Sequence, residues 1–241
     1  MFNPFKKKSS QPQVESETQS KDQSQLKPEP QIRDVLFGDV PISQWPKDST
    51  SPEAEPWASF VEARTQVASG RTEAAVEALQ RILAMPDLES RHYLQAWHFL
   101  RQAGIQPDPE VSRQLYGVIV EFTRAEGLFI VAAYADLRAR CFHDTGAAVV
   151  WEAPRADTAL DQAVRDVLSA GKVVSDVIGV WEQERPPAPS TGQARINMLT
   201  PGGLRFGQGP FDVLAGDALG GPVISAASQL MQALTAKSRK G

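Results

Sequence analysis

Five charged residues in the second half of the chain could bind an anion. Asp136, Arg138 and Arg140 alternate along one short segment, so in an extended strand their side chains would share one face. Two arginines on such a face can hold a carboxylate or phosphate through paired hydrogen bonds. Arg195 and Arg205 could add to this set. The same pattern also fits a solvated strand face with a local Asp–Arg pair, and the residues alone leave both interpretations open.

A second candidate chemistry is nucleophilic catalysis by Cys141 and His143. In an extended strand the two side chains would lie on the same side, so their spacing is compatible with a Cys–His dyad. No third residue that would orient the histidine is indicated, and a lone strand cysteine is more often a small buried apolar residue. The chain also lacks the G-x-S-x-G pattern of a serine nucleophile. We therefore predict no catalytic residue, and the sequence leans against an enzyme.

Metal and phosphate sites are not indicated either. His92 and His98 lie six residues apart on a predicted helix, which places them roughly 240° apart around its axis, too far for a shared metal. The single cysteine cannot supply a zinc site alone. The glycines of TPGGLRFGQGP (200–210) lack the phosphate-loop order, and Gly202 and Gly203 fit a hairpin turn better. The sequence predicts no cofactor and no metal.

Composition narrows the possible partners and surroundings. The 241 residues carry a net charge of -4 and one cysteine, which argues against a broad nucleic-acid surface and excludes an internal disulfide framework. No apolar run approaches the roughly 20 residues that span a bilayer, so we expect no transmembrane segment and a cytoplasmic location. Phe2 and Phe5 beside three lysines predict at most a weak membrane contact through residues 2–8.

The chain divides into a polar start, a linker and one predicted domain. Residues 1–31 are rich in Gln, Ser, Lys, Glu and Pro, too polar to bury a core, and predict a disordered tail. Residues 32–56 are predicted to be a linker or docking segment, its first part, 32–45, extended. The remaining predicted parts are a single α+β domain over 57–236, made of a helical part (57–104) and a sheet plus helices (105–236), and a frayed end over 237–241.

Hydrophobic spacing predicts the elements that would position these residues. Three helices are expected before Gly104, the third with Tyr93, Trp97 and Leu100 on one face. Residues 118–122 fit a helix or a strand, and the β-branched run with Gly117 favours a strand. The expected architecture is an antiparallel meander sheet of about five to six strands. A long helix over 158–181, begun by Thr158 as N-cap, is expected to cover one face of that sheet.

Two stretches resemble a family of uncharacterised bacterial proteins. The residues that carry the resemblance are AYADLRAR, the turn and VVWE after it, and RINMLTPGGLRFGQGPF; it extends over roughly residues 90–236. It implies a bacterial cytoplasmic protein and supplies no activity or functional residue. In that family a glycine commonly occupies the turn position that Leu137 holds here, so the turn type is left open.

Two functions are compatible with these observations. The first is a non-enzymatic protein-interaction or adaptor domain, which binds a protein partner or a second copy of itself. The alternative is a binder, or a hydrolase, of a small anionic ligand through the arginine-bearing strand face. Trp45 and Trp57 near the linker, and Trp151 and Trp181 near the ends of predicted elements, could anchor a partner, because tryptophan is enriched at interfaces. Core packing is the favoured role for Trp151.

Overall fold

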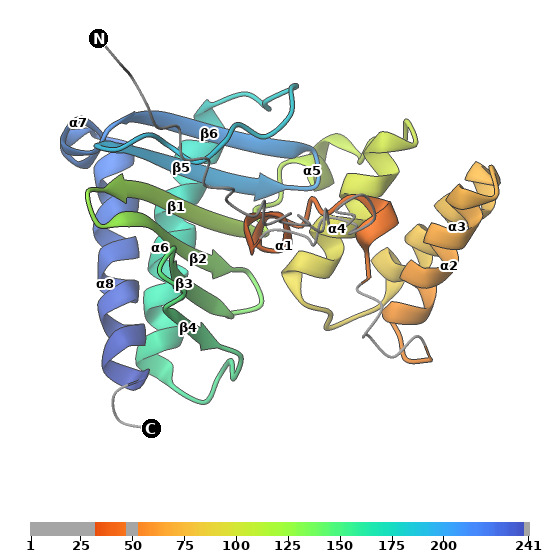
Figure 1. The fold of residues 1–241 in the computed structure, drawn as a ribbon, viewed down its shortest axis with the longest axis horizontal. Coiled ribbons are helices and arrows are strands. Elements are labelled where there is room, and N and C mark those ends of the chain that lie inside the picture. Colours follow the sequence, from red (N-terminus) through yellow and green to blue (C-terminus); the bar gives the residue numbers. More distant parts are fainter. Residues whose placement is uncertain (1–31, 47–52, 239–241) are drawn as a thin grey trace, which may run out of the picture.

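Six antiparallel strands form one open sheet in the order β4-β3-β2-β1-β5-β6 (Figure 1). The computed structural model describes residues 32–46 and 53–238, so the predicted tail and residues 239–241 lie outside the described residues. The strands are β1 (Gly117–Arg124), β2 (Gly127–Tyr134), β3 (Ala139–His143), β4 (Ala148–Trp151), β5 (Gln193–Thr200) and β6 (Gly203–Pro210). The first four strands form a meander, and the β5–β6 hairpin pairs with the open side of β1. The predicted α+β fold with an antiparallel sheet is confirmed.

Helices cover both faces of this sheet (Figure 1). In the described part of the chain they are α1 (Ile32–Phe37), α2 (Trp57–Ala68), α3 (Thr72–Ala84), α4 (Ser90–Gln102), α5 (Pro109–Ser112), α6 (Thr158–Val177), α7 (Phe211–Gly216) and α8 (Gly220–Ser238), with a short 3-10 turn at Ile42–Gln44. Across residues 32–46 and 53–238, none of these helices has the length and apolar character required to cross a bilayer.

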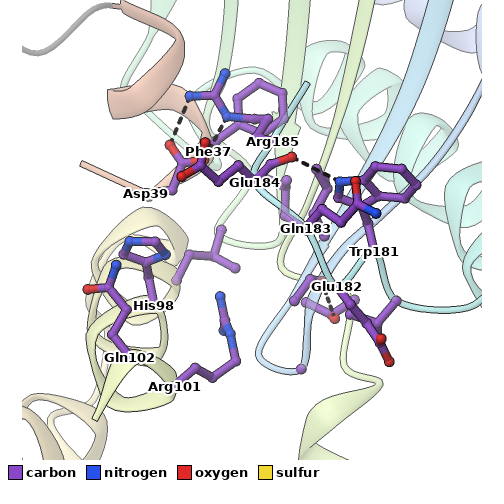
Figure 2. A pocket seen from close by; sticks show the side chains of 18 of the residues that line it. Phe37, Asp39, His98, Arg101, Gln102, Trp181, Glu182, Gln183, Glu184 and Arg185 are labelled. Atoms are coloured by element: carbon purple, nitrogen blue, oxygen red, sulfur yellow. Dashed lines mark hydrogen bonds and ion pairs between the residues drawn. The ribbon is translucent and has the colours of Figure 1, made fainter. Parts of the chain in front are cut away.

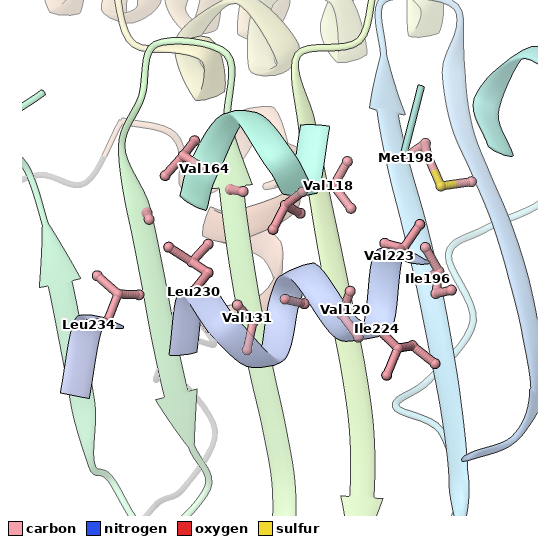
Figure 3. Packing of buried hydrophobic residues seen from close by; sticks show 14 of the residues in the cluster. Val118, Val120, Val131, Val164, Ile196, Met198, Val223, Ile224, Leu230 and Leu234 are labelled. Carbon is pink, nitrogen blue, oxygen red and sulfur yellow. The ribbon is translucent and has the colours of Figure 1, made fainter. Parts of the chain in front are cut away.

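One sheet face forms the main core with α6 and α8 (Figure 3). Alternate residues of the central strands point to this face, among them Val118, Val131 and Met198, and all three are buried. A close contact brings α6 against β1: a Cβ atom on Gly171 would lie 2.4 Å from a methyl carbon of Val118. Only a residue without a side chain fits at this point of the helix.

The opposite face of the sheet is covered by α1 and by one side of α4. Leu36 and Leu94 pack there on Ile119 and Tyr134, all four buried. The Tyr134 hydroxyl donates a hydrogen bond to the carbonyl of Leu36 at 2.8 Å, which fixes α1 above the central strands. The fold therefore has three layers: the sheet in the middle, α6 and α8 on one side, and the N-terminal elements on the other.

The segment 32–45 departs from the predicted extended conformation. Its first six residues form α1 and residues 42–44 form a 3-10 turn. The segment docks on the sheet as a helix, because this form buries Leu36 and Phe37. A pattern of six residues is too short to reveal such tertiary burial. Val40 continues the docking, since its backbone N–H and carbonyl both bond to the side-chain amide of Gln95, at 3.1 and 2.8 Å.

Helices α2, α3 and α4 form a second core beside the sheet. Phe60, Leu79, Ile82 and Leu100 are buried in it together with Val40 from the N-terminal segment. The predicted face of α4 is only partly correct: Leu100 is buried, whereas Tyr93 and Trp97 are half-buried and Leu94, Ala96 and Phe99 are buried instead. The reason is that α4 contacts both this core and the sheet, so its buried surface is wider than one stripe.

Three local predictions can be compared with the structure. Residues 118–122 are part of β1, as favoured. The long helix ends at Val177, not 181, and its N-cap is Asp157, whose carboxylate accepts from the backbone N–H groups of Ala159 and Leu160. Leu137 has a backbone φ of 66°, a left-handed conformation that glycine adopts more readily, so this turn keeps a glycine-like shape without the glycine.

Candidate ligand-binding site

The predicted arginine strand lies where α4 meets the β2–β3 turn and the end of β4. Arg138 bonds Asp136 at 3.2 Å and Glu152 at 2.9 Å, and Arg140 pairs with Glu152 and lies 3.8 Å from Glu89. Asp136 also accepts from the backbone N–H of Ser90, at the start of α4, at 2.8 Å. The structure thus brings these three predicted residues together, and it surrounds both arginines with carboxylates of the same chain.

The other two predicted arginines lie elsewhere and on opposite faces of the sheet. Arg195 is buried beside α1 and donates to Gln208 and to the carbonyls of Pro186 and Pro187. Arg205 faces α6 and donates to the carbonyls of Ser175 and Ile178, at 3.1 and 2.6 Å. A five-residue anion site is therefore not assembled, although ligand binding by Arg138 and Arg140 stays a prediction.

Cys141 and His143 share one face of β3 but are not arranged as a nucleophile and its base. His143 Nδ1 lies 2.7 Å from the Thr145 hydroxyl, and its ring contacts that of Phe129 in a tilted arrangement, with the ring centroids 4.2 Å apart. Cys141 packs against the main core, where burial raises the pKa of its thiol and so disfavours the reactive thiolate. Among the residues that the structure describes, no group of His, Cys, Asp and Glu could hold a metal ion.

A cavity of about 750 Å³ lies on the sheet face that carries α1, where four separate segments meet (Figure 2). This volume is in the range typical of small-molecule sites. The four segments are residues 37–39 after α1, the C-terminal half of α4 with Gln106, the connector 180–185 that follows α6, and the β5–β6 hairpin at residues 199–204. Each segment comes from a different part of the chain, so the cavity exists only in the folded protein.

Arg101 is the principal charged group of the α4 wall. One of its terminal nitrogens donates a hydrogen bond to the carbonyl of Pro201, in the turn between β5 and β6. Burial lowers the pKa of the Arg101 guanidinium, and the negative charge of Asp39, which also lines the cavity, partly counteracts this decrease. Within residues 32–46 and 53–238, no carboxylate forms an ion pair with Arg101. A half-buried guanidinium without an acidic partner is the main unpaired charge here.

His98 lies one turn before Arg101 on the same wall. Burial, together with the positive charges of Arg101 and Arg185, lowers the pKa of His98 to about 4. The imidazole is therefore neutral at pH 7, so one ring nitrogen can donate a hydrogen bond and the other can accept one. Together with the amides of Gln102 and Gln106, it gives this wall several polar groups beside the one charge.

The connector wall is held in place by Arg185 and Trp181. Arg185 bonds the carboxylate of Asp39 through two nitrogens, at 2.6 and 3.1 Å, and also pairs with Asp34. The backbone N–H of Trp181 donates to the carbonyl of Leu204 at 2.7 Å, and its ring packs against Phe206. Both contacts join the connector to other walls of the cavity, so hydrogen bonds within the chain fix the position of this wall.

Acid should weaken the folded state because of two histidines. Burial lowers the pKa of both His92 and His98 from 6.5 to about 4. Since the unfolded chain binds protons first, stability is intact above pH 6.5 and falls as the pH drops from 6.5 towards 4. We expect a combined loss of about 2 kcal/mol or more in urea unfolding at the acidic end. A protein with glutamine at both positions should lose clearly less; an equal loss would contradict this assignment.

Sequence reasoning considered His98 only as a metal ligand and did not select Arg101 at all. The spacing of three residues between them places both on one helix face, and this was the available signal. Nothing in the sequence shows that this face looks into a cavity closed by residues 180–185. Trp181, expected near an element end, does line the cavity.

Comparison with family models, with curated proteins and with solved structures finds no match to this chain. The resemblance to a bacterial family therefore stays a prediction, and the function has to be argued from the geometry of the site.

Proposed function

We propose that the protein is a non-catalytic binding module that holds a small anionic ligand in the cavity between α4 and the connector 180–185. The observation that carries this proposal is Arg101. A guanidinium that is partly withdrawn from water loses hydration, and without a carboxylate paired with it that loss is only partly offset, by the Pro201 carbonyl and the more distant Asp39. A bound anion would supply the missing partner. The proposal takes up the anionic ligand that was the alternative interpretation of the sequence and assigns it to a different arginine.

The contrast with the other arginines supports this choice. Arg138, Arg140 and Arg185 each pair with at least one carboxylate, and a ligand would have to displace it. Arg101 uses one of its five N–H groups, on Pro201, and its other donors are available to a guest in the cavity. The residues around it include no arrangement of nucleophile and base, which favours binding over hydrolysis.

Native mass spectrometry of the full-length protein, purified gently from the cells that make it, tests the proposal. We expect a small additional mass on the natural protein and its loss when Arg101 is replaced by methionine, which keeps the length of the side chain but removes the charge. Arg165→Met is the matched control, because Arg165 is exposed on α6 and far from the cavity lining. An additional mass that persists in Arg101→Met, or the absence of any from the natural protein, would contradict the proposal.

An adaptor role is the second candidate, and one surface favours it. Val173 and Val177 lie one turn apart on the outer side of α6 and are 56% and 63% exposed. Together the two valines expose apolar surface on one side of the helix, and contiguous apolar surface is what marks a site of contact with another protein. In the same mass spectra, a stoichiometric protein partner or a second copy of the chain, without a small additional mass, would support this role.

A further inference from the structure

The walls of the cavity restrict the kind of anion that fits. We infer that the ligand is a monocarboxylate attached to a flat, mostly apolar body, bound with its carboxylate on Arg101 and its body against the Trp181 wall. This inference rests on the proposed binding function and adds the chemical class of the ligand.

The charges of the lining favour a single negative charge. Two arginines and three carboxylates line the cavity: Arg101, Arg185, Asp39, Glu182 and Glu184. Arg185 and Asp39 neutralise one another at 2.6 Å, which leaves Arg101 as the one unpaired cation among the described lining residues. Glu182 and Glu184 are exposed at the connector, where they would repel a second negative charge on the ligand. A polyanion such as a nucleotide phosphate is therefore disfavoured.

The bonds that Arg101 can form and the charges near it together favour a carboxylate over a phosphate. The planar guanidinium can bond both oxygens of a carboxylate side by side, and such paired bonds are among the stronger ones in proteins. One N–H of Arg101 is used by Pro201, which leaves enough donors for this arrangement. A phosphate monoester could accept the same bonds, but it carries close to two negative charges at neutral pH and would face the two glutamates of the connector.

The remaining lining suits an apolar group. Four side chains without hydrogen-bonding atoms line the cavity from α1, α4 and the β5–β6 hairpin: Phe37, Leu94, Leu199 and Leu204. Val180 and Trp181 line it from the connector. The indole N–H of Trp181 already donates to the carbonyl of Glu184 at 2.9 Å. The Trp181 side chain therefore has no free hydrogen-bonding atom for a ligand. A ligand can use the face of its ring, on which a flat group stacks well.

Calorimetric titration of the full-length protein with four probes tests this class. Naphthylacetate has the carboxylate and the flat body, naphthylethanol lacks the charge, naphthyl phosphate doubles it, and acetate lacks the ring. We expect naphthylacetate to bind at least about tenfold more tightly than each of the others, a difference of about 1.4 kcal/mol. Arg101→Met should reduce its affinity to that of naphthylethanol, and Trp181→Ala should weaken it about tenfold.

Two further variants and a measurement of folding distinguish a loss of binding from a loss of structure. Arg101→Lys keeps the charge without the planar fork and should bind with intermediate affinity, whereas Arg165→Met should bind like the natural protein. Thermal unfolding of every variant establishes that it is folded at the temperature of the titration.

The possible outcomes separate the class of ligand from the binding function. Tighter binding of naphthyl phosphate, or equal binding of naphthylethanol or acetate, would overturn the monocarboxylate class and leave the cavity a binding site. The class would also be wrong if no probe bound while the Arg101-dependent mass was present in native spectra. If neither the probes nor that mass were found, the proposed function itself would fail.

Discussion

Replacing Glu121 by alanine is expected to lower the free energy of unfolding by about 3–5 kcal/mol. Glu121 is completely buried in the middle of β1, and its carboxylate accepts from Arg33 at 2.6 and 3.2 Å and from the Asn197 amide at 3.1 Å. Arg195 lies 3.6 Å away. Without the carboxylate, the guanidinium groups of Arg33 and Arg195 would lose the buried negative charge that compensates them. This uncompensated charge is the source of the loss.

Urea unfolding followed by circular dichroism measures this effect, and Glu62→Ala is its control. Glu62 also pairs with an arginine, Arg81, but both side chains are nearly half exposed, at 44% and 48%. Water screens such a pair, so its removal should change the free energy by less than about 1 kcal/mol. Equal losses of unfolding free energy in the two variants would contradict the prediction that the buried Glu121 pair contributes more than an exposed one.

Replacing Leu230 by alanine is expected to lower the free energy of unfolding by about 2–5 kcal/mol. Leu230 lies on α8, is completely buried and points between that helix and the sheet (Figure 3). Its loss removes apolar contacts and leaves a cavity that the rigid sheet cannot fill by moving. The same urea measurement with Leu219→Ala provides the comparison, because Leu219 is 39% exposed and should contribute far less. Similar values for both leucines would contradict the assignment of the main core.

The parts of the fold that the sequence predicted are those with strong local patterns. The alternation in β2 and the β-branched run in β1 identified two central strands, and the stripe from Leu160 to Val174 identified α6. The α1 helix was missed because six residues carry too little periodicity. Its helical form depends on contacts with Tyr134 and Glu121, about a hundred residues later.

The candidate site was less predictable than the fold, for a related reason. The arginines at 138 and 140 stood out because they alternate in a strand, yet the acidic residues that neutralise them include Glu89 and Glu152 from distant segments. Arg101 had no local signature, because what distinguishes it is the absence of a carboxylate after folding. Which arginine is left without a partner depends on tertiary contacts, and no pattern within one helix expresses it.

The contacts of α1 also set an order of events during synthesis. Asp34 pairs with Arg185, which follows it by 151 residues, and Arg33 pairs with Glu121, which follows it by 88. A ribosome adds about 5–20 residues per second, so roughly 8–30 s pass between the synthesis of Asp34 and that of Arg185. During that interval Leu36 and Phe37, which the finished protein buries to 0% and 5% exposure, have no complete sheet to cover. The newly made chain therefore exposes this apolar segment until β5 and β6, which follow the connector, have also left the ribosome.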